Sequence, residues 1–448
     1  MPDLSLTEHL ARWLVRWREN GFPRDVRATA QNYVLDWLGS ALAGAATDVG
    51  KRLCDYARTQ PAGNASIIGL NRACSAETAA LVNGALSHIV EMDDLDRASV
   101  LHPGAAVIPA AFAVAEATRA PGRDFLAAVV AGYEVAIRVG EAVGKRHYYY
   151  FHNTATCGVF GAAAAAGWLL NLNAKQFVWA LGNAGTQAAG LWEFNADGAM
   201  SKHLHAGRAA ANGALAAQLA QFDFTGARAI LEGPRGFFAA TAPDAQPARV
   251  LENLDAPAPR FKISGVSIKP HASCRHTHSA IDAALALRAQ LNPRAIQRVQ
   301  IDTYPAALDL CNNSNPQTEY AAKFSLHFCV ASALLRGHAG LEDFANAALT
   351  DSAVRELLPR ITATVEPEFQ ARYPAEWATR IRITASDGEM LSATVINPKG
   401  DPENPLSQNE LAEKFRQLAA FAGHGAHADA YIAWVSGLDA DEPLFFPR

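Results

Sequence analysis

The stretch Val159-Phe-Gly-Ala-Ala-Ala-Ala-Ala-Gly-Trp-Leu-Leu170 decides the character of the fold, because its middle carries almost no side-chain bulk. A second run of this kind is Ala209-Ala-Ala-Asn-Gly-Ala-Leu-Ala-Ala217. Small side chains allow helix backbones to approach closely in a packed interior. The first run is also too short to cross a bilayer as a helix. We therefore expect both runs to form helices at the centre of a bundle.

Helical periodicity extends from the N-terminus to about residue 255. Apolar residues recur at spacings of three and four, and the breaks between segments carry Pro, Gly or Asn. This pattern predicts an all-helical domain. The predicted helices cover residues 7–19, 25–45, 76–90, 105–117, 123–143, 157–170, 174–188 and 205–221.

The pattern changes after Phe261, where β-branched residues begin to alternate with polar ones. Strands are predicted at residues 296–304, 361–365, 379–384 and 391–396, and Asp387-Gly388 predicts a hairpin turn between the last two. The helices predicted between them cover residues 276–290, 321–336, 341–348 and 352–357. Strands mixed with helices in this way indicate a smaller α+β domain.

The two chain ends are expected to meet in one domain. Helical periodicity returns at residues 407–435, after a proline-rich crossing at Pro398, Pro402 and Pro405. We therefore predict a mainly α fold, with a large helical domain at 1–262 that is completed by 400–448. The α+β domain is predicted at 263–399.

Composition narrows the classes of function. The 448 residues are 50% hydrophobic and 19% charged, with a formal net charge of −5. Lys and Arg are scattered, so no basic stripe is available for nucleic acid. The six cysteines are dispersed without a C-x-x-C pair, and neither a signal peptide nor a membrane span is apparent. We expect a soluble, cytoplasmic protein with reduced thiols that binds neither nucleic acid nor membrane.

The polar stretch from His88 to Gly104 is the strongest functional signal. Acidic residues, including Asp93 and Asp94, precede His102, and Pro103 suits the first position of the apolar helix that follows. A helix N-terminus favours anions, and an imidazole moves protons near neutral pH. The stretch therefore suits proton transfer on an anionic substrate. The alternative is a purely structural interpretation, in which the stretch is a solvent-exposed acidic loop followed by a capped helix.

Three further polar clusters are expected just before helices. Each combines Lys, Arg, His or hydroxyl groups that can hold a carboxylate or share a proton with it. Each of these residues could instead have a structural role, in packing or on the surface, and take no part in chemistry. The clusters are His152-Asn153-Thr154-Ala155-Thr156, Ser201-Lys202-His203-Leu204-His205-Ala206-Gly207-Arg208 and Lys269-Pro270-His271-Ala272-Ser273-Cys274-Arg275-His276-Thr277-His278.

Metal or cofactor chemistry is the weaker hypothesis. The pairs His203/His205 and His276/His278 resemble ligand pairs, but residues two apart do not share a helix face and no H-E-x-x-H motif is present. The cysteine spacing does not suit an iron–sulfur cluster, and no dinucleotide, phosphate-loop or nucleophile-elbow motif is found. We predict no metal and no cofactor, so that side chains alone perform the chemistry.

Taken in order, these clusters resemble the MmgE/PrpD family over essentially the whole chain. The family signature of a His, an acidic run and HPS or HPG is similar to His88…Glu91-Met92-Asp93-Asp94…His102-Pro103-Gly104. The later family segments are similar to Phe151-His152-Asn153-Thr154, Lys202-His203-Leu204-His205-Ala206-Gly207, Lys269…Cys274-Arg275-His276-Thr277-His278 and Ala322-Lys323-Phe324-Ser325-Leu326.

The resemblance implies a large helical domain made from both chain ends, a smaller α+β lid domain between them, and a homodimer. It also implies a cofactor-free site in the cleft between the domains. Members of the family include 2-methylcitrate dehydratase, cis-aconitate decarboxylase and iminodisuccinate epimerase. They act on small di- and tricarboxylates by removing a proton next to a carboxylate.

Three positions depart from the family pattern. Glu91 stands where many members have Asp, Leu95 stands where the decarboxylase branch has Thr, and Cys274 stands where that branch has His. The last two departures argue against a cis-aconitate decarboxylase. Our leading hypothesis is a hydro-lyase similar to 2-methylcitrate dehydratase. The alternatives are an epimerase or racemase of an amino- or imino-dicarboxylate, and a catalytically silent carboxylate-binding protein.

We assign roles on this hypothesis. Lys202 or His102 takes and returns the proton, Asp93 and Asp94 orient His102 or share its proton, and His278 is a second candidate acid on one helix face with Cys274. Lys269 and Arg275 hold carboxylates and the developing enolate. The predicted substrate-binding residues are Glu91, His152, Thr154, Arg208, Lys269, Cys274, Arg275 and His276.

Overall fold

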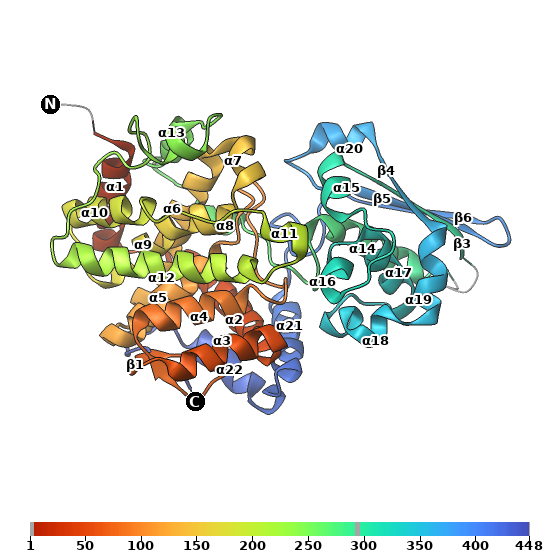
Figure 1. Ribbon diagram of the computed structural model, residues 1–448, viewed down its shortest axis with the longest axis horizontal. Helices are drawn as coiled ribbons and strands as arrows, with labels where there is room; N and C mark the ends of the chain where they lie inside the picture. The colour runs from red at the N-terminus through yellow and green to blue at the C-terminus, as the bar shows by residue number, and fades with distance from the viewer. Residues whose placement is uncertain (1–3, 292–295, 448) are drawn as a thin grey trace. The chain divides into compact units, whose positions relative to one another are not determined.

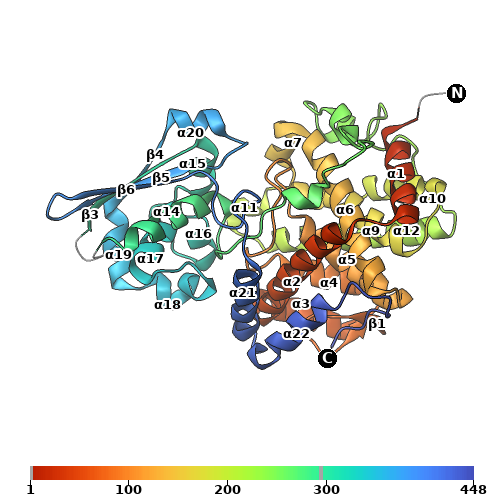
Figure 2. The same ribbon diagram turned by 180° about the vertical axis from the view of Figure 1, so that it is seen from behind.

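The computed structural model describes residues 4–291 and 296–447 and divides into two compact units (Figure 1). Unit 1 contains residues 1–89, 93–266 and 407–448, and unit 2 contains residues 90–92 and 267–406. Helices dominate unit 1, whereas the four-stranded sheet belongs to unit 2 (Figures 1 and 2). The predicted fold class, mainly helical with a smaller α+β part, is confirmed.

The interior of unit 1 is built from helices with small side chains. Every residue of α9 is buried, and α9 packs against α5, α6 and α12. A Cβ added at Gly161 would lie 2.5 Å from the carbonyl oxygen of Gly132 in α6. The low bulk of this helix is therefore required by how closely its neighbours approach. These central helices are α4 (Ala76–Ser87), α5 (Pro103–Thr118), α6 (Gly122–Ala142), α9 (Gly158–Leu169) and α12 (Ser201–Gln221).

The C-terminal segment returns to unit 1. Helix α21 packs against α2, and the buried side chains of Lys414 and Asp36 form an ion pair between the two helices (Figure 2). The remaining helices of unit 1 are α1 (Leu6–Asn20), α2 (Arg24–Ala46), α3 (Asp48–Thr59), α7 (Gly144–Tyr150), α8 (Asn153–Thr156), α10 (Ala174–Gly185), α11 (Phe194–Asp197), α13 (Phe237–Thr241), α21 (Gln408–Phe421) and α22 (Ala428–Ser436), with short 3₁₀ helices η1 (Pro247–Leu251), η2 (Lys262–Gly265) and η7 (Gly425–His427).

Unit 1 is not wholly helical. Strands β1 (Ala62–Ser66) and β2 (Ala73–Cys74) form a small antiparallel sheet that the sequence analysis did not predict. Its edge is tied to helix α5, because the backbone N–H of Ser66 donates to Glu116 at 2.6 Å. Such short strands, with Gly and Asn inside them, carry little of the alternating pattern that identifies a strand.

Unit 2 contains a four-stranded sheet in the order β4-β3-β5-β6. Strands β3 and β4 pair in parallel, whereas β3–β5 and β5–β6 are antiparallel. The predicted hairpin is present, with Gly388 at φ 88°, a conformation that glycine adopts without strain. The strands are β3 (Ile296–Thr303), β4 (Ile361–Val365), β5 (Thr379–Ala385) and β6 (Met390–Val395).

Of the four helices predicted in unit 2, the one at 352–357 is confirmed, and the other three are shorter or divided. The segment predicted as one helix at 321–336 is two helices, because Ser325 caps a new helix by accepting from the N–H of Phe328. Helix α14 packs against β5 and β6. The helices are η3 (Arg275–Thr277), α14 (His278–Arg288), α15 (Pro305–Cys311), α16 (Glu319–Lys323), α17 (Leu326–Arg336), η5 (Leu341–Phe344), α18 (Asn346–Leu349), α19 (Ser352–Leu357), η6 (Leu358–Arg360) and α20 (Pro367–Arg372).

Within the described residues, no helix has both the length and the apolar character that a membrane crossing requires.

Candidate active site

His102 lies at the N-terminus of α5, as predicted. Pro103 occupies the first helical position, and His102 is the N-cap residue with φ −98° and ψ 83°. Its backbone N–H donates to Oγ1 of Thr154 at 3.2 Å. The loop before it is closed by the backbone pair Asp96–Leu101, and Val100 is held at φ 49°. A β-branched residue rarely adopts positive φ, so the surrounding loop must hold this backbone in place.

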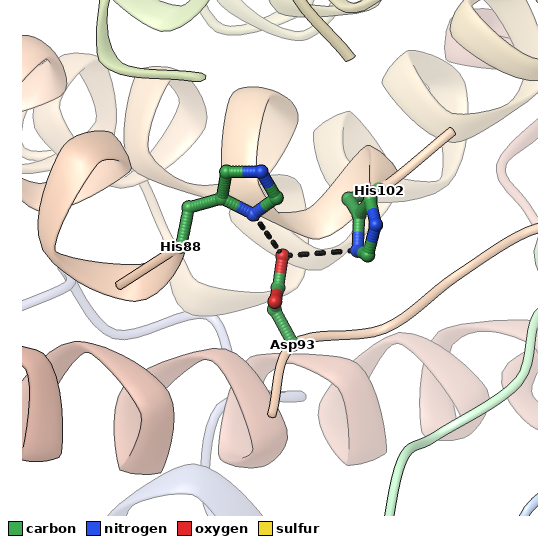
Figure 3. Close-up of side chains that lie close together, drawn as sticks. All are labelled: His88, Asp93 and His102. Carbon is green, nitrogen blue, oxygen red and sulfur yellow. Dashed lines mark hydrogen bonds and ion pairs between the residues drawn. The ribbon is translucent and has the colours of Figure 1, made fainter. Parts of the chain in front are cut away.

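Asp93 lies between two imidazole rings (Figure 3). Nδ1 of His88 is hydrogen-bonded to Oδ2 of Asp93 at 2.6 Å, and Nδ1 of His102 lies 3.1 Å from the same oxygen. The side chains of His88 and Asp93 are 0% and 2% exposed, whereas that of His102 is 13% exposed. A carboxylate can only accept, so the Nδ1 of His88 that is hydrogen-bonded to it carries the proton. The contact from Nδ1 of His102 is an ion-pair distance. His102 is the most exposed of the three.

The same three residues are the candidate metal ligands among the described residues, because their donor atoms all lie within 4.8 Å of one another. The observed contacts do not fit an ion well. Two ligand atoms held about 2.0–2.2 Å from one ion normally stay about 3 Å apart, whereas His88 and Asp93 are separated by 2.6 Å. That distance is typical of a charge-assisted hydrogen bond. We therefore treat the group as a hydrogen-bonded cluster.

Further imidazoles extend this cluster inside unit 1. The His152 ring stacks on that of His88 with centroids 5.4 Å apart, and Nδ1 of His205 lies 3.4 Å from Nδ1 of His152. Burial, followed by repulsion from His88, Lys202, His205 and His102, lowers the pKa of His152 well below its usual value. Burial likewise lowers the pKa of His205 to about 4. Both imidazoles are therefore neutral at physiological pH.

The Lys202 cluster lies inside a helix, which corrects one prediction. Helix α12 begins at Ser201 and not at residue 205, so Lys202 and His203 belong to its first turn. Lys202 is 4% exposed. Arg208 is exposed and lines a cavity of about 690 Å³ together with Glu193, Leu204, His205 and Asn212. Lys202 therefore belongs to the interior of unit 1, whereas Arg208 faces this surface cavity.

Asp94 does not serve the role predicted for it. Its Oδ1 accepts from the N–H of Gly104 at 3.0 Å, and its Oδ2 accepts from the hydroxyl of Tyr133 at 2.6 Å. Burial raises the pKa of Asp94 well above its usual range. Asp94 thus anchors the first turn of α5, and the carboxylate of Asp93 contacts His102. This difference follows from the loop geometry, which turns the two neighbouring acids in different directions.

The predicted residues of unit 2 form a separate group of buried charges. Nζ of Lys269 lies 3.6 Å from Oε2 of Glu91, and the two side chains are 1% and 3% exposed. Glu91 has a positive φ of 61°, which marks a locally constrained backbone. The two side chains therefore form a buried ion pair within unit 2.

Arg275 is committed to other residues of unit 2. Its guanidinium pairs with the buried carboxylate of Asp401, donates to Nδ1 of His278 at 2.8 Å and donates to the carbonyl oxygen of Lys399 at 3.2 Å. Burial and repulsion from Arg275 lower the pKa of His278 well below its usual value. These contacts favour a structural role for Arg275 over the predicted binding of a substrate carboxylate.

Cys274 and His278 do not share a helix face, which corrects a second prediction. Cys274 precedes the 3₁₀ helix η3, and α14 begins only at His278. The thiol of Cys274 interacts with that of Cys311, which raises the pKa of the Cys311 thiol further than burial alone. His276 is also buried, with its ring stacked 4.2 Å from that of Trp377 and Nδ1 bonded to the hydroxyl of Tyr304 at 2.7 Å. Burial lowers its pKa to about 3.

Two residues of these clusters could not be identified from the sequence pattern. His88 lies in the polar stretch before α5, but its spacing suggests no role for it, and no sequence motif includes Asp401. The five-residue spacing from His88 to Asp93 crosses the end of α4, so helical periodicity gives no sign that they meet. Asp401 lies 126 positions from Arg275 in the sequence. Only the fold brings these two together.

The group in unit 1 is suited to general acid–base chemistry. It has a buried carboxylate that fixes an imidazole, and that imidazole stands partly exposed at the start of a helix. Its neighbours His152 and His205 are neutral, and the Lys202 side chain is close enough to both to affect their titration. This arrangement can remove a proton from an anionic compound and return it.

Comparisons with known proteins agree with the motifs. Residues 8–250 match the model of the MmgE/PrpD N-terminal domain, and residues 271–438 match that of the MmgE/PrpD C-terminal domain. The chain is 29% identical to a cis-aconitate decarboxylase-like protein, oryM, of Aspergillus oryzae over 94% of this chain and 91% of the relative. It is 27% identical to a cis-aconitate decarboxylase of Aspergillus terreus, over 97% and 93% of the two chains. It is 29% identical to that of Homo sapiens, over 93% and 88%. The two domain models together cover most of the sequence, and the chain belongs to the MmgE/PrpD family.

Proposed function

We propose that this protein is a cofactor-independent lyase that acts on a small di- or tricarboxylate. The reaction begins with removal of a proton next to a carboxylate. One observation carries the proposal, namely that a single oxygen of buried Asp93 faces both His88 and the partly exposed His102. An imidazole held in this way has one nitrogen fixed and the other available as a base.

His102 is our candidate for the general base. With its Nδ1 proton directed to Asp93, its Nε2 accepts the substrate proton, and Asp93 stabilises the imidazolium that forms. Thr154 sets the backbone of His102, and His152 provides a neutral hydrogen-bonding group beside it. This division of roles needs no group beyond the side chains named.

Lys202 is our candidate for the group that returns the proton or stabilises the enolate. It is buried in the first turn of α12, and an ammonium in a poorly solvated site interacts strongly with a developing negative charge. In unit 2, the fixed charge of Lys269 beside Glu91 makes Lys269 the candidate for holding a substrate carboxylate. Turnover by Lys202→Ala equal to that of the unaltered protein would remove Lys202 from this assignment. Exposed Lys51→Ala provides the matched control.

Two lyase reactions are open to this site. Loss of water is our leading proposal, because Leu95 and Cys274 depart from the decarboxylase pattern. Loss of CO₂ is the second candidate, and the names of the relatives favour it, since those compared above are decarboxylases or decarboxylase-like. Loss of water needs a base that removes the α-proton, whereas loss of CO₂ needs an acid that delivers a proton to the carbon skeleton as the CO₂ leaves. Both reactions gain from electrostatic stabilisation of an enolate-like intermediate.

Proton NMR in D₂O distinguishes these outcomes. The purified protein is incubated with 2-methylcitrate, citrate, cis-aconitate, malate and iminodisuccinate. Loss of water from a hydroxy acid supports the hydro-lyase, and formation of a decarboxylated product from cis-aconitate supports the decarboxylase. Exchange of an α-proton without net product would instead indicate an epimerase. Binding of an acid without exchange or product would indicate a silent carboxylate-binding protein.

The same assay tests whether the activity needs a metal ion. We expect dialysis against EDTA to leave the rate unchanged, because the cluster is held by hydrogen bonds. A loss of activity that returns when Zn²⁺ or Mg²⁺ is added would contradict the cofactor-independent proposal.

We also propose that the chain forms a homodimer through unit 1. Two exposed apolar side chains, Leu191 and Leu204, line the wall of the surface cavity. Arg208 and Glu193 also line it and form no ion pair with each other among the described contacts, so two copies related by a twofold axis could pair them reciprocally. Tyr149, Tyr150 and Met200 are further exposed apolar residues of unit 1.

Light scattering after size exclusion tests the dimer. We expect a mass of two chains, reduced to one chain by Leu204→Glu. A single-chain mass for the unaltered protein would contradict the proposal. A cytoplasmic location is likewise proposed and is tested by cell fractionation.

A further inference from the structure

We propose that His88 is a positioning residue, which acts through Asp93 to orient His102 and to fix the ring nitrogen that carries its proton. The inference rests on the proposed function, which makes His102 the base. His88 itself is 0% exposed. It therefore cannot meet a substrate directly, and any effect it has on chemistry must pass through a neighbour.

The backbone of His88 is fixed by the end of a helix. His88 is the C-cap of α4, and its N–H donates to the carbonyl oxygens of Ala85 and Leu86. The ring packs edge-on against that of His102, with centroids 4.8 Å apart, and lies parallel to that of His152. Its position is set by α4 and by these rings, so Nδ1 has a defined direction.

The hydrogen bond of His88 goes to the oxygen that faces His102. Oδ2 of Asp93 is 2.6 Å from Nδ1 of His88 and 3.1 Å from Nδ1 of His102, as Figure 3 shows. Within the described part of the chain, Nε2 of His88 has no hydrogen-bond partner. The hydrogen bond from Nδ1 to Asp93 is thus the polar contact through which the His88 ring can act. That bond prevents the carboxylate from rotating away from His102.

The bond also affects how strongly Asp93 attracts the proton of His102. Two N–H donors divide the negative charge of one oxygen, so each receives a weaker interaction than it would alone. Further titratable groups interact with this cluster: His205 and Lys202 act on His152, and the buried acid Asp94 interacts with Asp93. Removing the donor at position 88 therefore leaves Asp93 as a stronger partner for protonated His102. His102 should then hold its proton up to a higher pH.

The test compares two variants of His88 with a matched control. His88→Phe keeps an aromatic ring against His152 but removes the donor, whereas His88→Asn retains an N–H near the position of Nδ1. The control is His147→Phe, because His147 is also 0% exposed and bonds through both nitrogens, to Thr156 and Thr241, away from Asp93. Both Phe variants remove a buried imidazole of unit 1.

Two measurements are made on these proteins. Nitrogen NMR of the imidazoles, assigned with His102→Gln, reports the tautomer and titration of His102 without any need for turnover. The pH dependence of kcat/KM is recorded with whichever acid the protein converts. We expect His88→Phe to shift the acid limb and the His102 titration upward by about one pH unit. It should also lower kcat about tenfold to a hundredfold at neutral pH.

The conservative variant and the control separate a positioning role from simple packing. His88→Asn should restore most of kcat and return the titration toward that of the unaltered protein, and His147→Phe should lower stability without moving either titration. An unchanged tautomer and unchanged pH profile in His88→Phe would overturn the inference and leave His88 as packing alone. If His102 responds as expected in the NMR experiment but no acid is converted, the positioning role stands and the proposed function fails.

Discussion

The two units differ in how their buried charged and titratable side chains are paired. In unit 1, the single carboxylate of Asp93 faces two imidazoles, with further neutral imidazoles beyond them. In unit 2, buried cations have dedicated counter-ions, Glu91 for Lys269 and Asp401 for Arg275. A shared carboxylate orients imidazoles, which are the side chains that exchange protons near neutral pH, whereas a matched ion pair holds opposite charges together.

We propose, on this difference, that unit 1 provides the proton chemistry and that unit 2 provides matched ion pairs. General acid–base catalysis needs a side chain that gains and loses a proton readily near neutral pH, and imidazole is the side chain of this kind. The guanidinium of Arg275 is instead paired with the buried carboxylate of Asp401. Changes in the shared cluster should therefore alter rate, and changes in the paired cluster should alter stability.

The largest effect is expected for Asp93→Asn. The amide can donate to Nδ1 of His102, which would place the ring proton on Nε2 and remove the base. We expect kcat to fall about 10³- to 10⁴-fold, as for a carboxylate that sets a catalytic tautomer. Steady-state kinetics with the acid identified by NMR measures this loss. A loss smaller than tenfold would place the proton chemistry elsewhere.

A large loss of stability is expected for Asp401→Asn in unit 2. The change leaves the guanidinium of Arg275 buried without its counter-ion, which costs about 3–5 kcal/mol. Chemical denaturation followed by circular dichroism measures the free energy of unfolding. The matched control is Glu368→Gln, which removes an exposed partner of Arg372 and should cost less than about 1 kcal/mol. Equal losses in the two variants would contradict the importance of the buried pair.

The stability of unit 2 should depend on pH through His276. Its pKa is about 3 in the folded chain because of burial, so only the unfolded chain binds a proton there between about pH 6.5 and 3. Stability is therefore lost as the pH falls through this window. From pH 6.5 to pH 5 the loss is about 2 kcal/mol for this group. His276→Phe should show a correspondingly shallower acid dependence in denaturation curves, and an identical dependence would exclude this histidine as the cause.

The smallest effect is expected for Asp94→Asn, the neighbour of Asp93. The amide oxygen can still accept from Gly104, and its nitrogen can donate to the hydroxyl of Tyr133. We expect activity within about fivefold of the unaltered protein and a loss of stability of about 1 kcal/mol. Activity and thermal unfolding are measured side by side with Asp93→Asn. A loss of rate as large as that of Asp93→Asn would contradict the assignment of different roles to Asp93 and Asp94.

Much of the fold could be predicted because its helices carry strong local patterns. The apolar run of α9 and the proline at the start of α5 were recognised directly, and the strands of unit 2 were located within about two residues. The short strands β1 and β2 were missed because they are held by contacts to α5 and α4 rather than by their own pattern. The break at Ser325 was missed because a cap inside an apolar run interrupts no periodicity.

The candidate site was harder to predict than the fold. The sequence placed His102 at a helix start, and the structure has it there. It could not tell which way each acid points, because Asp93 and Asp94 are adjacent and chemically identical. Likewise, the Arg275–Asp401 pair joins segments that only the tertiary fold brings together. Side-chain direction and long-range pairing are properties of the folded chain.

The most direct test of the central claim is deuterium incorporation from D₂O by His102→Gln. Proton NMR follows the hydrogen next to the substrate carboxylate in the unaltered protein and in the variant, with the acid at saturating concentration. The unaltered protein should exchange or transfer this hydrogen at the rate of turnover, and the variant should be slower by about 10²- to 10⁴-fold. Incorporation at an unchanged rate in His102→Gln would contradict the claim that the imidazole cluster of unit 1 performs the proton chemistry.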